Sequence, residues 1–262
     1  MGIATAACTQ DTAMIRTIRR SAILGLISVI TGSAASAQTA PALTVLELFT
    51  SQGCSSCPAA DALFKSYVER PDVLALSFSV DYWDYLGWKD TLASPKFTER
   101  QRVYGKSVNN GQIYTPQIVV NGSRHVVGSS KGDIEAAVAA SRGSSGVPTF
   151  QVDASRVGGA ITIQIAGNSA TSPVAATAAV GVVWLLTVRG QQTIVVKRGE
   201  NSGRTLDYLN SVRDVAQVGA WTGKGMTVNL PAGAASLGAE ERYAVLIQRG
   251  IQGPLLAAAW VK

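Results

Sequence analysis

Residues 46–58 read LELFTSQGCSSCP, and this stretch decides how the rest of the chain is interpreted. An apolar run of strand length leads to Cys54 and Cys57, with Pro58 directly after them. Because proline is tolerated in the first turn of a helix, where its missing N–H is not needed, a helix is expected to begin here. The sulfur of Cys54 would then lie beside the free N–H groups of that turn, which favour a thiolate and lower the thiol pKa.

Three roles are open for this cysteine pair. A zinc site needs four ligands from Cys, His or carboxylate groups, and the chain has one histidine, His125. Copper held by Cys54, Cys57 and His125 is an alternative, because thiolates and imidazole suit that metal. A structural disulfide is another, although so short a loop gains little from lost chain entropy. The favoured hypothesis is a redox pair in which Cys54 attacks a disulfide and Cys57 resolves the mixed disulfide.

The N-terminal segment is typical of a secretory signal peptide. Three arginines precede an apolar run at residues 22–30, and small residues follow at 35–37 (ASA). The apolar run is too short to span a bilayer, which takes about 20 residues. We therefore expect residues 1–37 to be removed, by the Sec or the twin-arginine route, and the mature protein to be periplasmic or secreted, without a stable membrane span. That compartment permits a disulfide between the two remaining cysteines.

Strand and helix signals alternate between residues 43 and 145, which predicts an α/β domain over residues 38–145 with the order β-α-β-α-β-β-α. The expected strands are residues 43–49, 73–80, 117–122 and 124–128, and the expected helices are residues 58–70, 94–108 and 130–141.

Beyond a linker-like stretch at residues 142–148, helix signals almost vanish. Short apolar segments between glycine-rich turns predict a small all-β, sandwich-like domain over residues 146–262. Its expected strands are residues 149–153, 160–165, 182–188, 193–196, 226–230, 243–248 and 255–261. Residues 199–205 read as a polar loop, in which Arg204 could bind a carboxylate or lock the two domains together.

Thr115 and Pro116 directly precede the strand expected at residues 117–122. Together with the C-x-x-C motif and the element order, this resembles the thioredoxin-like superfamily over residues 43–145. The resemblance implies that Pro116 is cis and lies against the sulfurs, and that the backbone at Thr115 pairs with an extended substrate peptide.

Four segments together resemble a secreted bacterial thioredoxin-like family labelled domain of unknown function 1223. They are LELFTSQGCSSCPAAD, SVDYWDYLGWKD, YTPQIVVNG and ENSGRTLDYLNSVRD. The resemblance covers nearly the whole mature chain and implies a thioredoxin-like core and export, with no known substrate.

Other residues suggest a groove or a proton relay. The segment at residues 81–88 follows the second strand, so it is expected at the same sheet edge as Cys54. Its aromatic side chains, Trp83 among them, form either the wall of a peptide groove, with Asp81 or Asp84 moving protons, or a lid over the core. Glu47, inside an apolar strand, is a candidate for a buried carboxylate that relays protons to the second cysteine, as the resemblance suggests.

The sequence thus predicts an exported thiol–disulfide exchange protein whose partners are protein or small-molecule disulfides and thiols. The alternatives are a binding protein on a thioredoxin-like scaffold with a structural disulfide, and a copper- or zinc-handling protein. No cofactor is expected. The formal net charge is +6 without a long run of basic residues, so no nucleic acid is expected as a partner.

Overall fold

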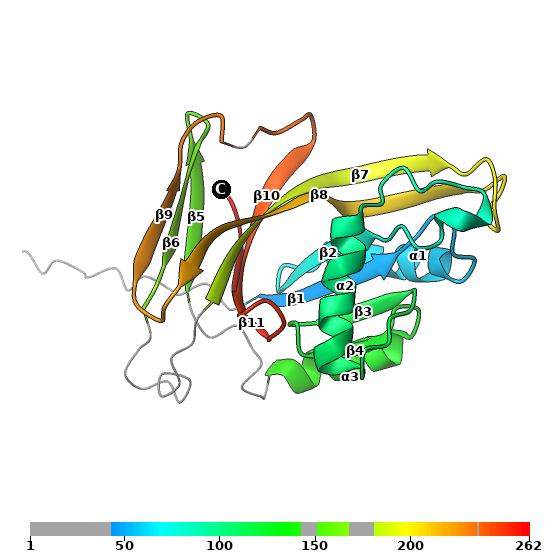
Figure 1. Ribbon diagram of the computed structural model, residues 1–262, viewed down its shortest axis with the longest axis horizontal. Helices are drawn as coiled ribbons and strands as arrows, with labels where there is room; N and C mark the ends of the chain where they lie inside the picture. Colours follow the sequence, from blue (N-terminus) through cyan, green and yellow to red (C-terminus); the bar gives the residue numbers. More distant parts are fainter. Residues whose placement is uncertain (1–42, 143–150, 168–180, 235) are drawn as a thin grey trace, which may run out of the picture. The chain divides into compact units, whose positions relative to one another are not determined.

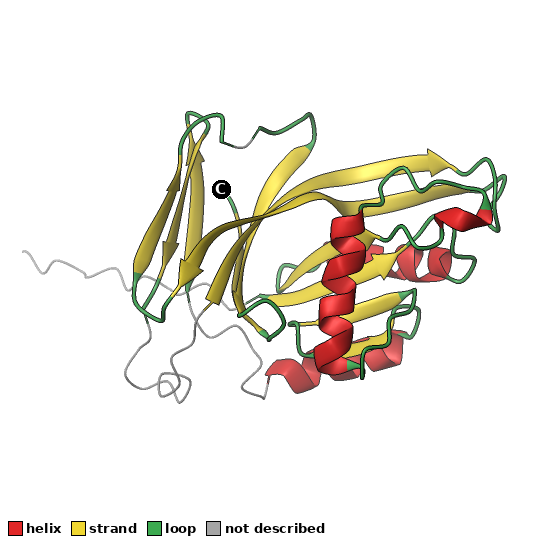
Figure 2. Ribbon diagram, in the orientation of Figure 1, coloured by secondary structure: helices red, strands yellow, loops and turns green. Residues whose placement is uncertain are grey.

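The computed structural model describes residues 43–142, 151–167, 181–234 and 236–262. The predicted signal peptide and most of the predicted linker lie outside these ranges. Figure 1 shows the arrangement of the elements, and Figure 2 shows that the helices belong to the first half of the described chain and the second half is built of strands. Within the described residues, no helix combines the length and apolar character needed to cross a membrane.

The first half has the predicted order β-α-β-α-β-β-α, with a short 3-10 helix added. Its elements are β1 (Thr44–Thr50), α1 (Cys57–Val68), β2 (Val73–Ser79), η1 (Asp84–Leu86), α2 (Pro95–Val108), β3 (Gln117–Val120), β4 (Arg124–Val127) and α3 (Lys131–Arg142). Strands β1 and β2 are parallel, whereas β3 pairs antiparallel with both β1 and β4.

Helices cover both faces of this part of the sheet, which is why every residue of β1 and β2 is buried. One apolar cluster joins β1 to α1 and α3, and a second joins the other face of β1 to α2. In Figure 1, α2 accordingly crosses in front of the strands.

The second half contributes two sets of strands. They are β5 (Val152–Val157), β6 (Ala160–Ile165), β7 (Gly181–Val195), β8 (Thr205–Trp221), β9 (Met226–Leu230), β10 (Glu241–Arg249) and β11 (Leu255–Trp260). Four of them extend the first sheet into an eight-stranded mixed sheet of order β11-β10-β7-β8-β2-β1-β3-β4, while β5, β6 and β9 form an antiparallel sheet of three strands. An apolar cluster that includes Ile163, Val228, Trp221 and Val245 packs these two sheets together.

Two of the strands differ from the sequence-based expectation. The segments expected at residues 182–188 and 193–196 form one strand, β7, and the 17-residue strand β8 was not expected. β8 carries Asp207, Arg213 and Asp214 among its apolar residues, so it lacks the apolar run or strict alternation by which a strand is recognised. Its pairing with β7 includes two register shifts, which further break the alternation.

The two halves of the chain meet where β8 lies parallel to β2. Ser77 pairs with Ser211 there, and the side-chain amide of Asn210 donates a hydrogen bond of 2.9 Å to the carbonyl oxygen of Ala75. Asn210 has a φ of 48°, which turns its amide toward β2, and Arg242 donates to its side-chain oxygen. Strands from both halves thus share one sheet, and the described residues all belong to one compact unit.

Candidate functional site

Cys54 and Cys57 form a disulfide between the end of β1 and the start of α1. The backbone N–H of Cys57 donates to the carbonyl oxygen of Cys54 at 3.2 Å, and the Ser56 hydroxyl lies 3.4 Å from the Cys54 sulfur. The pair therefore lies at a helix N-terminus, as the position of Pro58 predicted. Only 1% of Cys54 and none of Cys57 is exposed, so an attacking group reaches the sulfurs only if a neighbouring segment moves.

We call residues 51–57, from the end of β1 to the first residue of α1, the cysteine loop. Trp83 connects the cysteine loop with the loop that contains Pro116. A Cβ added to Gly53 would lie 3.0 Å from the Trp83 Cβ, so the two residues are in close contact. The Trp83 indole N–H donates to the Thr115 hydroxyl at 2.8 Å, and the Thr115–Pro116 peptide bond is cis. The segment at residues 81–88 and the Thr115–Pro116 pair are therefore both linked to the strand edge that carries Cys54.

Pro116 also lies close to the helix that begins at Cys57. A Cβ added to Gly128 would lie 3.2 Å from the Pro116 Cβ and 3.3 Å from the Ala60 Cβ. Ala60 is one turn along α1 from Cys57, so the cis-proline loop packs against the first turn of that helix through Gly128.

A segment of the second half completes the site. We call residues 196–204, which join β7 to β8, the hairpin tip. The side-chain amide of Asn201 donates to the carbonyl oxygens of Gln52 and Cys54 at 3.0 and 2.9 Å, and its own oxygen accepts from Arg204 at 3.0 Å. A carboxylate oxygen of Glu200 accepts a hydrogen bond of 3.1 Å from the backbone N–H of Ser55. Arg204 therefore holds the cysteine loop indirectly, through Asn201. The sequence placed Arg204 in a polar loop but did not predict this contact.

The segment that precedes α2 also holds the cysteine loop. The backbone N–H of Gln52 donates to a carboxylate oxygen of Asp90 at 2.8 Å, and the Trp88 indole N–H donates to the Gln52 side chain at 2.8 Å. Burial raises the pKa of Asp90 to about 6, although its bond with Gln52 opposes this change. Nothing in the sequence around Asp90 pointed to this role.

Asp61 is a buried carboxylate that the sequence reading missed. It accepts a hydrogen bond of 3.1 Å from the Thr50 hydroxyl, and its second oxygen has no hydrogen-bond partner. Burial raises the pKa of Asp61 to about 8. The spacing could have found it, because positions 57, 61 and 64 lie on one face of a helix and Phe64 belongs to the core.

A family model for proteins of unknown function, DUF1223, matches residues 45–248. The chain belongs to the DUF1223 family. The protein AGR_C_4864 of Agrobacterium tumefaciens, known from an X-ray crystal structure, is similar to it with 35% identity and a TM-score of 0.72, over 84% of this chain and 95% of that chain. HBP35 of Porphyromonas gingivalis is similar in fold, with 11% identity and a TM-score of 0.56, over 84% of this chain and 74% of that chain. A comparison with curated proteins finds no match.

In this DUF1223 protein, Glu47 points to the face of β1 opposite α1. Its carboxylate forms an ion pair of 2.7 Å with Arg100 of α2 and accepts a hydrogen bond from the Tyr104 hydroxyl. Neighbours of Glu47 in β1 alternate between the two core clusters, so its side chain shares the α2 face with Val45 and Phe49. Asp61, on α1, is the buried carboxylate that shares a helix with Cys57.

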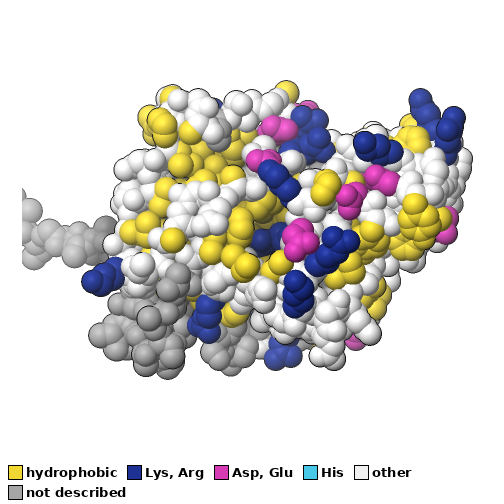
Figure 3. All heavy atoms as spheres, in the orientation of Figure 1, with side chains coloured by type: hydrophobic (Ala, Val, Ile, Leu, Met, Phe, Trp, Pro, Cys, Tyr) yellow, Lys and Arg dark blue, Asp and Glu magenta, His cyan; other side chains and the backbone are white. Residues whose placement is uncertain are grey.

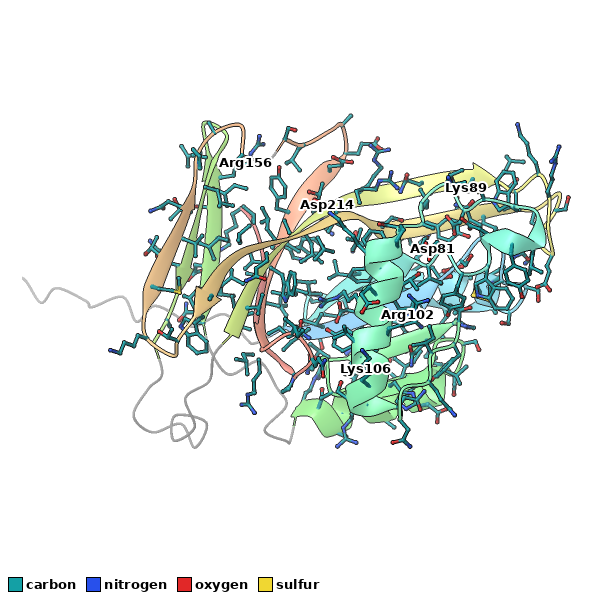
Figure 4. The ribbon with its side chains drawn as sticks, viewed as in Figure 1. Asp81, Lys89, Arg102, Lys106, Arg156 and Asp214 are labelled. Atoms are coloured by element: carbon teal, nitrogen blue, oxygen red, sulfur yellow. A yellow bond between two sulfur atoms is a disulfide. The ribbon has the colours of Figure 1, made fainter. Side chains whose placement is uncertain are left out.

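The two aspartates expected in the groove hold the 81–88 segment in place. The Thr98 hydroxyl of α2 donates to Asp81, and the backbone N–H of Asp90 donates to Asp84 at 3.0 Å. Figure 4 labels Asp81 close to α2. These bonds brace the segment, and Tyr85 within it is 79% exposed.

The described residues of the DUF1223 protein contain no group of three or more His, Cys, Asp or Glu side chains that could hold a metal ion. His125 lies on β4, where its Nδ1 is 3.0 Å from the Tyr114 hydroxyl. The three residues of the copper alternative thus form no such group here.

Proposed function

We propose that this DUF1223 protein is an exported thiol–disulfide exchange protein built on a thioredoxin-like scaffold. The observation that carries the proposal is the Cys54–Cys57 disulfide at the start of a helix, with the cis Thr115–Pro116 bond tied to the cysteine loop through Trp83. Export follows from the predicted signal peptide, residues 1–37.

The exchange would proceed in two steps. The Cys54 thiolate attacks one sulfur of a partner disulfide, the partner's S–S bond breaks, and the released sulfur takes up a proton. A mixed disulfide between Cys54 and the partner results. The Cys57 thiolate then attacks the Cys54 sulfur and releases the partner's second thiol, so two electrons pass from the protein dithiol to the partner disulfide. The reverse sequence oxidises a partner dithiol.

The helix N-terminus favours Cys54 as the attacking thiol and Cys57 as the resolving thiol. Cys54 precedes the first turn of α1 and can receive its free N–H groups, which stabilise a thiolate. Cys57 is the first residue of α1 and fully buried, which suits a thiol that reacts after the mixed disulfide has formed.

A binding protein with a structural disulfide is the second candidate, and the burial of both cysteines favours it. Equilibration with glutathione separates the two. A structural disulfide in an exported protein has a reduction potential below about −300 mV, whereas a catalytic pair lies higher.

Trapping of partners tests the exchange reaction itself. Cys57→Ala, expressed with the native leader, acid-quenched and thiol-blocked, should carry mixed disulfides visible on a non-reducing gel, because the resolving thiol is gone. The double variant Cys54→Ala/Cys57→Ala is the matched control and should carry none. A potential below about −300 mV together with an absence of adducts would reject the exchange function.

A further inference from the structure

The hairpin tip contacts the cysteine loop although it lies about 145 residues further along the chain. We propose that the hairpin tip sets the redox balance of the Cys54–Cys57 pair, with Glu200 favouring the disulfide and Asn201 positioning the loop. This inference rests on the proposed function and deepens it, because it names residues of the second half that control the exchange.

Packing against neighbouring side chains holds the hairpin tip in contact with the cysteine loop. Val196 of the tip belongs to an apolar cluster with Leu92, Leu206 and Tyr208. Gly199 has a φ of 76°, and a Cβ added to it would lie 3.3 Å from the Trp88 Cβ, so this position combines a left-handed backbone with a close approach. Glu200 and Asn201 follow directly and are thereby aimed at the cysteine loop.

Asn201 donates hydrogen bonds to two carbonyl groups of the loop, of which the Cys54 carbonyl also accepts from the backbone N–H of Cys57. It is 1% exposed, and both of its amide hydrogen bonds go to the cysteine loop, at Gln52 and Cys54. The bond from Arg204 to its oxygen fixes which way the amide faces. Losing Asn201 would remove its hydrogen bond to the Gln52 carbonyl and leave the Cys54 carbonyl with the Cys57 N–H alone, which is unfavourable at a buried position, so the loop would move.

Glu200 acts through charge. Its carboxylate accepts from the N–H of Ser55, which directly follows Cys54 and lies one residue before Ser56, the N-cap of α1, so the carboxylate is close to the positive end of this helix. Reduction of the disulfide and ionisation of the Cys54 thiol create a second anion on the residue that precedes Ser55, whose N–H this carboxylate accepts. Because like charges repel and both would draw on the same end of the helix, Glu200 disfavours the Cys54 thiolate and thereby the reduced form.

Cations on the same tip act in the opposite direction. Lys197 and Arg198 are exposed, and Figure 3 shows basic side chains at the end of the hairpin. Among the described residues, however, the charged side chains hydrogen-bonded to residues 52–57 are Glu200 and Asp90, and both are acidic. Glu200 is exposed as well, but it and Asp90 are bonded directly to the loop, whereas Lys197 and Arg198 form no hydrogen bond with it among the described residues, so the acidic groups should outweigh these cations.

The test compares Glu200→Gln with Glu69→Gln. Glutamine keeps an oxygen that can accept from Ser55 and removes only the charge. Glu69 caps the other end of α1, so the control makes the same chemical change on the same helix, about 18 Å away. Each protein is equilibrated at pH 8 with glutathione, where two glutathione thiols reduce the protein disulfide and leave as one glutathione disulfide.

Glu200→Gln should shift this equilibrium toward the dithiol by about threefold to tenfold, or about 15 to 30 mV, as expected for removing a partly solvated like charge. The shift should shrink in 1 M salt, which screens charges but leaves a packing change intact. Glu69→Gln should match the wild type. Asn201→Ala should accelerate reduction by dithiothreitol, whereas Ser202→Ala, on the same tip, should not.

Two results keep this inference separate from the proposed function. If the wild type exchanges with glutathione but Glu200→Gln behaves like Glu69→Gln, the role of Glu200 is refuted and the exchange function stands. If the wild type does not exchange at all, the exchange function fails, and the inference is decided on chemically reduced protein. The pH midpoint of Cys54 alkylation should then be lower in Glu200→Gln than in Glu69→Gln, and equal midpoints refute it.

Discussion

Two ion pairs on helix α2 have the same length and should differ widely in their effect on stability. The Lys96 ammonium and an Asp214 oxygen are 2.7 Å apart, and so are the Arg100 guanidinium and a Glu47 oxygen. Their exposure differs: the side chains of Lys96 and Asp214 are 63% and 52% exposed, whereas those of Arg100 and Glu47 are 8% and 0% exposed. Asp214 is labelled on β8 in Figure 4.

Arg100→Met should destabilise the protein far more than Lys96→Met. Removing Arg100 leaves the Glu47 carboxylate buried without its cation, and breaking a buried pair in this way costs about 3–5 kcal/mol. Contacts of the guanidinium with the rings of Phe78, Tyr104 and Trp184 would be lost as well. Lys96→Met removes a solvated pair and should change the free energy of unfolding by less than about 1 kcal/mol.

Urea unfolding of the oxidised protein, followed by circular dichroism, measures both variants on one scale. The double variant Glu47→Leu/Arg100→Met removes both charges and should recover much of the stability lost in Arg100→Met, because no unpaired charge remains. If Arg100→Met and Lys96→Met lose equal stability, burial does not decide the strength of these pairs. That result would refute the reasoning.

Three further predictions concern single side chains. Asp61 binds its proton more tightly in the folded state, so its contribution to the free energy of unfolding should be complete below pH 4 and be lost as the pH rises to about 8. Asp61→Asn should flatten this decline in stability, and parallel stability–pH curves of the variant and the wild type from pH 4 to 9 would contradict the prediction. Trp83→Phe and Thr115→Val should each remove one partner of the 2.8 Å hydrogen bond at a loss of about 1 kcal/mol, and a double-mutant cycle should show coupling, whereas strict additivity would show that the bond contributes nothing. Asn210→Gly should lose about 1–3 kcal/mol with the bond to Ala75, and Asn210→Ala about 1 kcal/mol more because its φ is 48°; equal losses would mean that the backbone conformation is immaterial.

Short sequence patterns predicted most of the helices and strands in the first half of the chain. The helix expected at residues 94–108 is α2, which begins at Pro95, and the Ser94 hydroxyl caps it by accepting from the backbone N–H of Lys96. Pro58 likewise marked the first turn of α1 and so placed Cys54 and Cys57 at its N-terminus. The burial of Glu47 was also expected from its apolar neighbours, but its partner Arg100 was not, because the two residues are 53 positions apart.

The strands of the second half depend on contacts between residues far apart in sequence, which no short sequence pattern predicts. β8 is a strand because β7 and β2 supply its hydrogen-bond partners, although its own sequence mixes charged and apolar residues. The spacing of Cys57 and Asp61 could have predicted that they share a helix face, whereas nothing near Asp90 connects it with Gln52.

The sequence by itself determined where the site lies, because a proline directly after a C-x-x-C motif is tolerated in the first turn of a helix and so places both cysteines at a helix N-terminus. It left the role of the pair open between a redox pair, a structural disulfide and a metal site, and the structure shows the two sulfurs joined in a disulfide. Only the tertiary structure decided what surrounds that disulfide. Residues 199–204 read as a polar loop in the sequence, and they contact the cysteine loop because β7 and β8 are long enough to bring Asn201 to the carbonyl oxygen of Cys54. Contacts between residues so distant in sequence follow from the packing of whole elements and not from the propensity of any short segment.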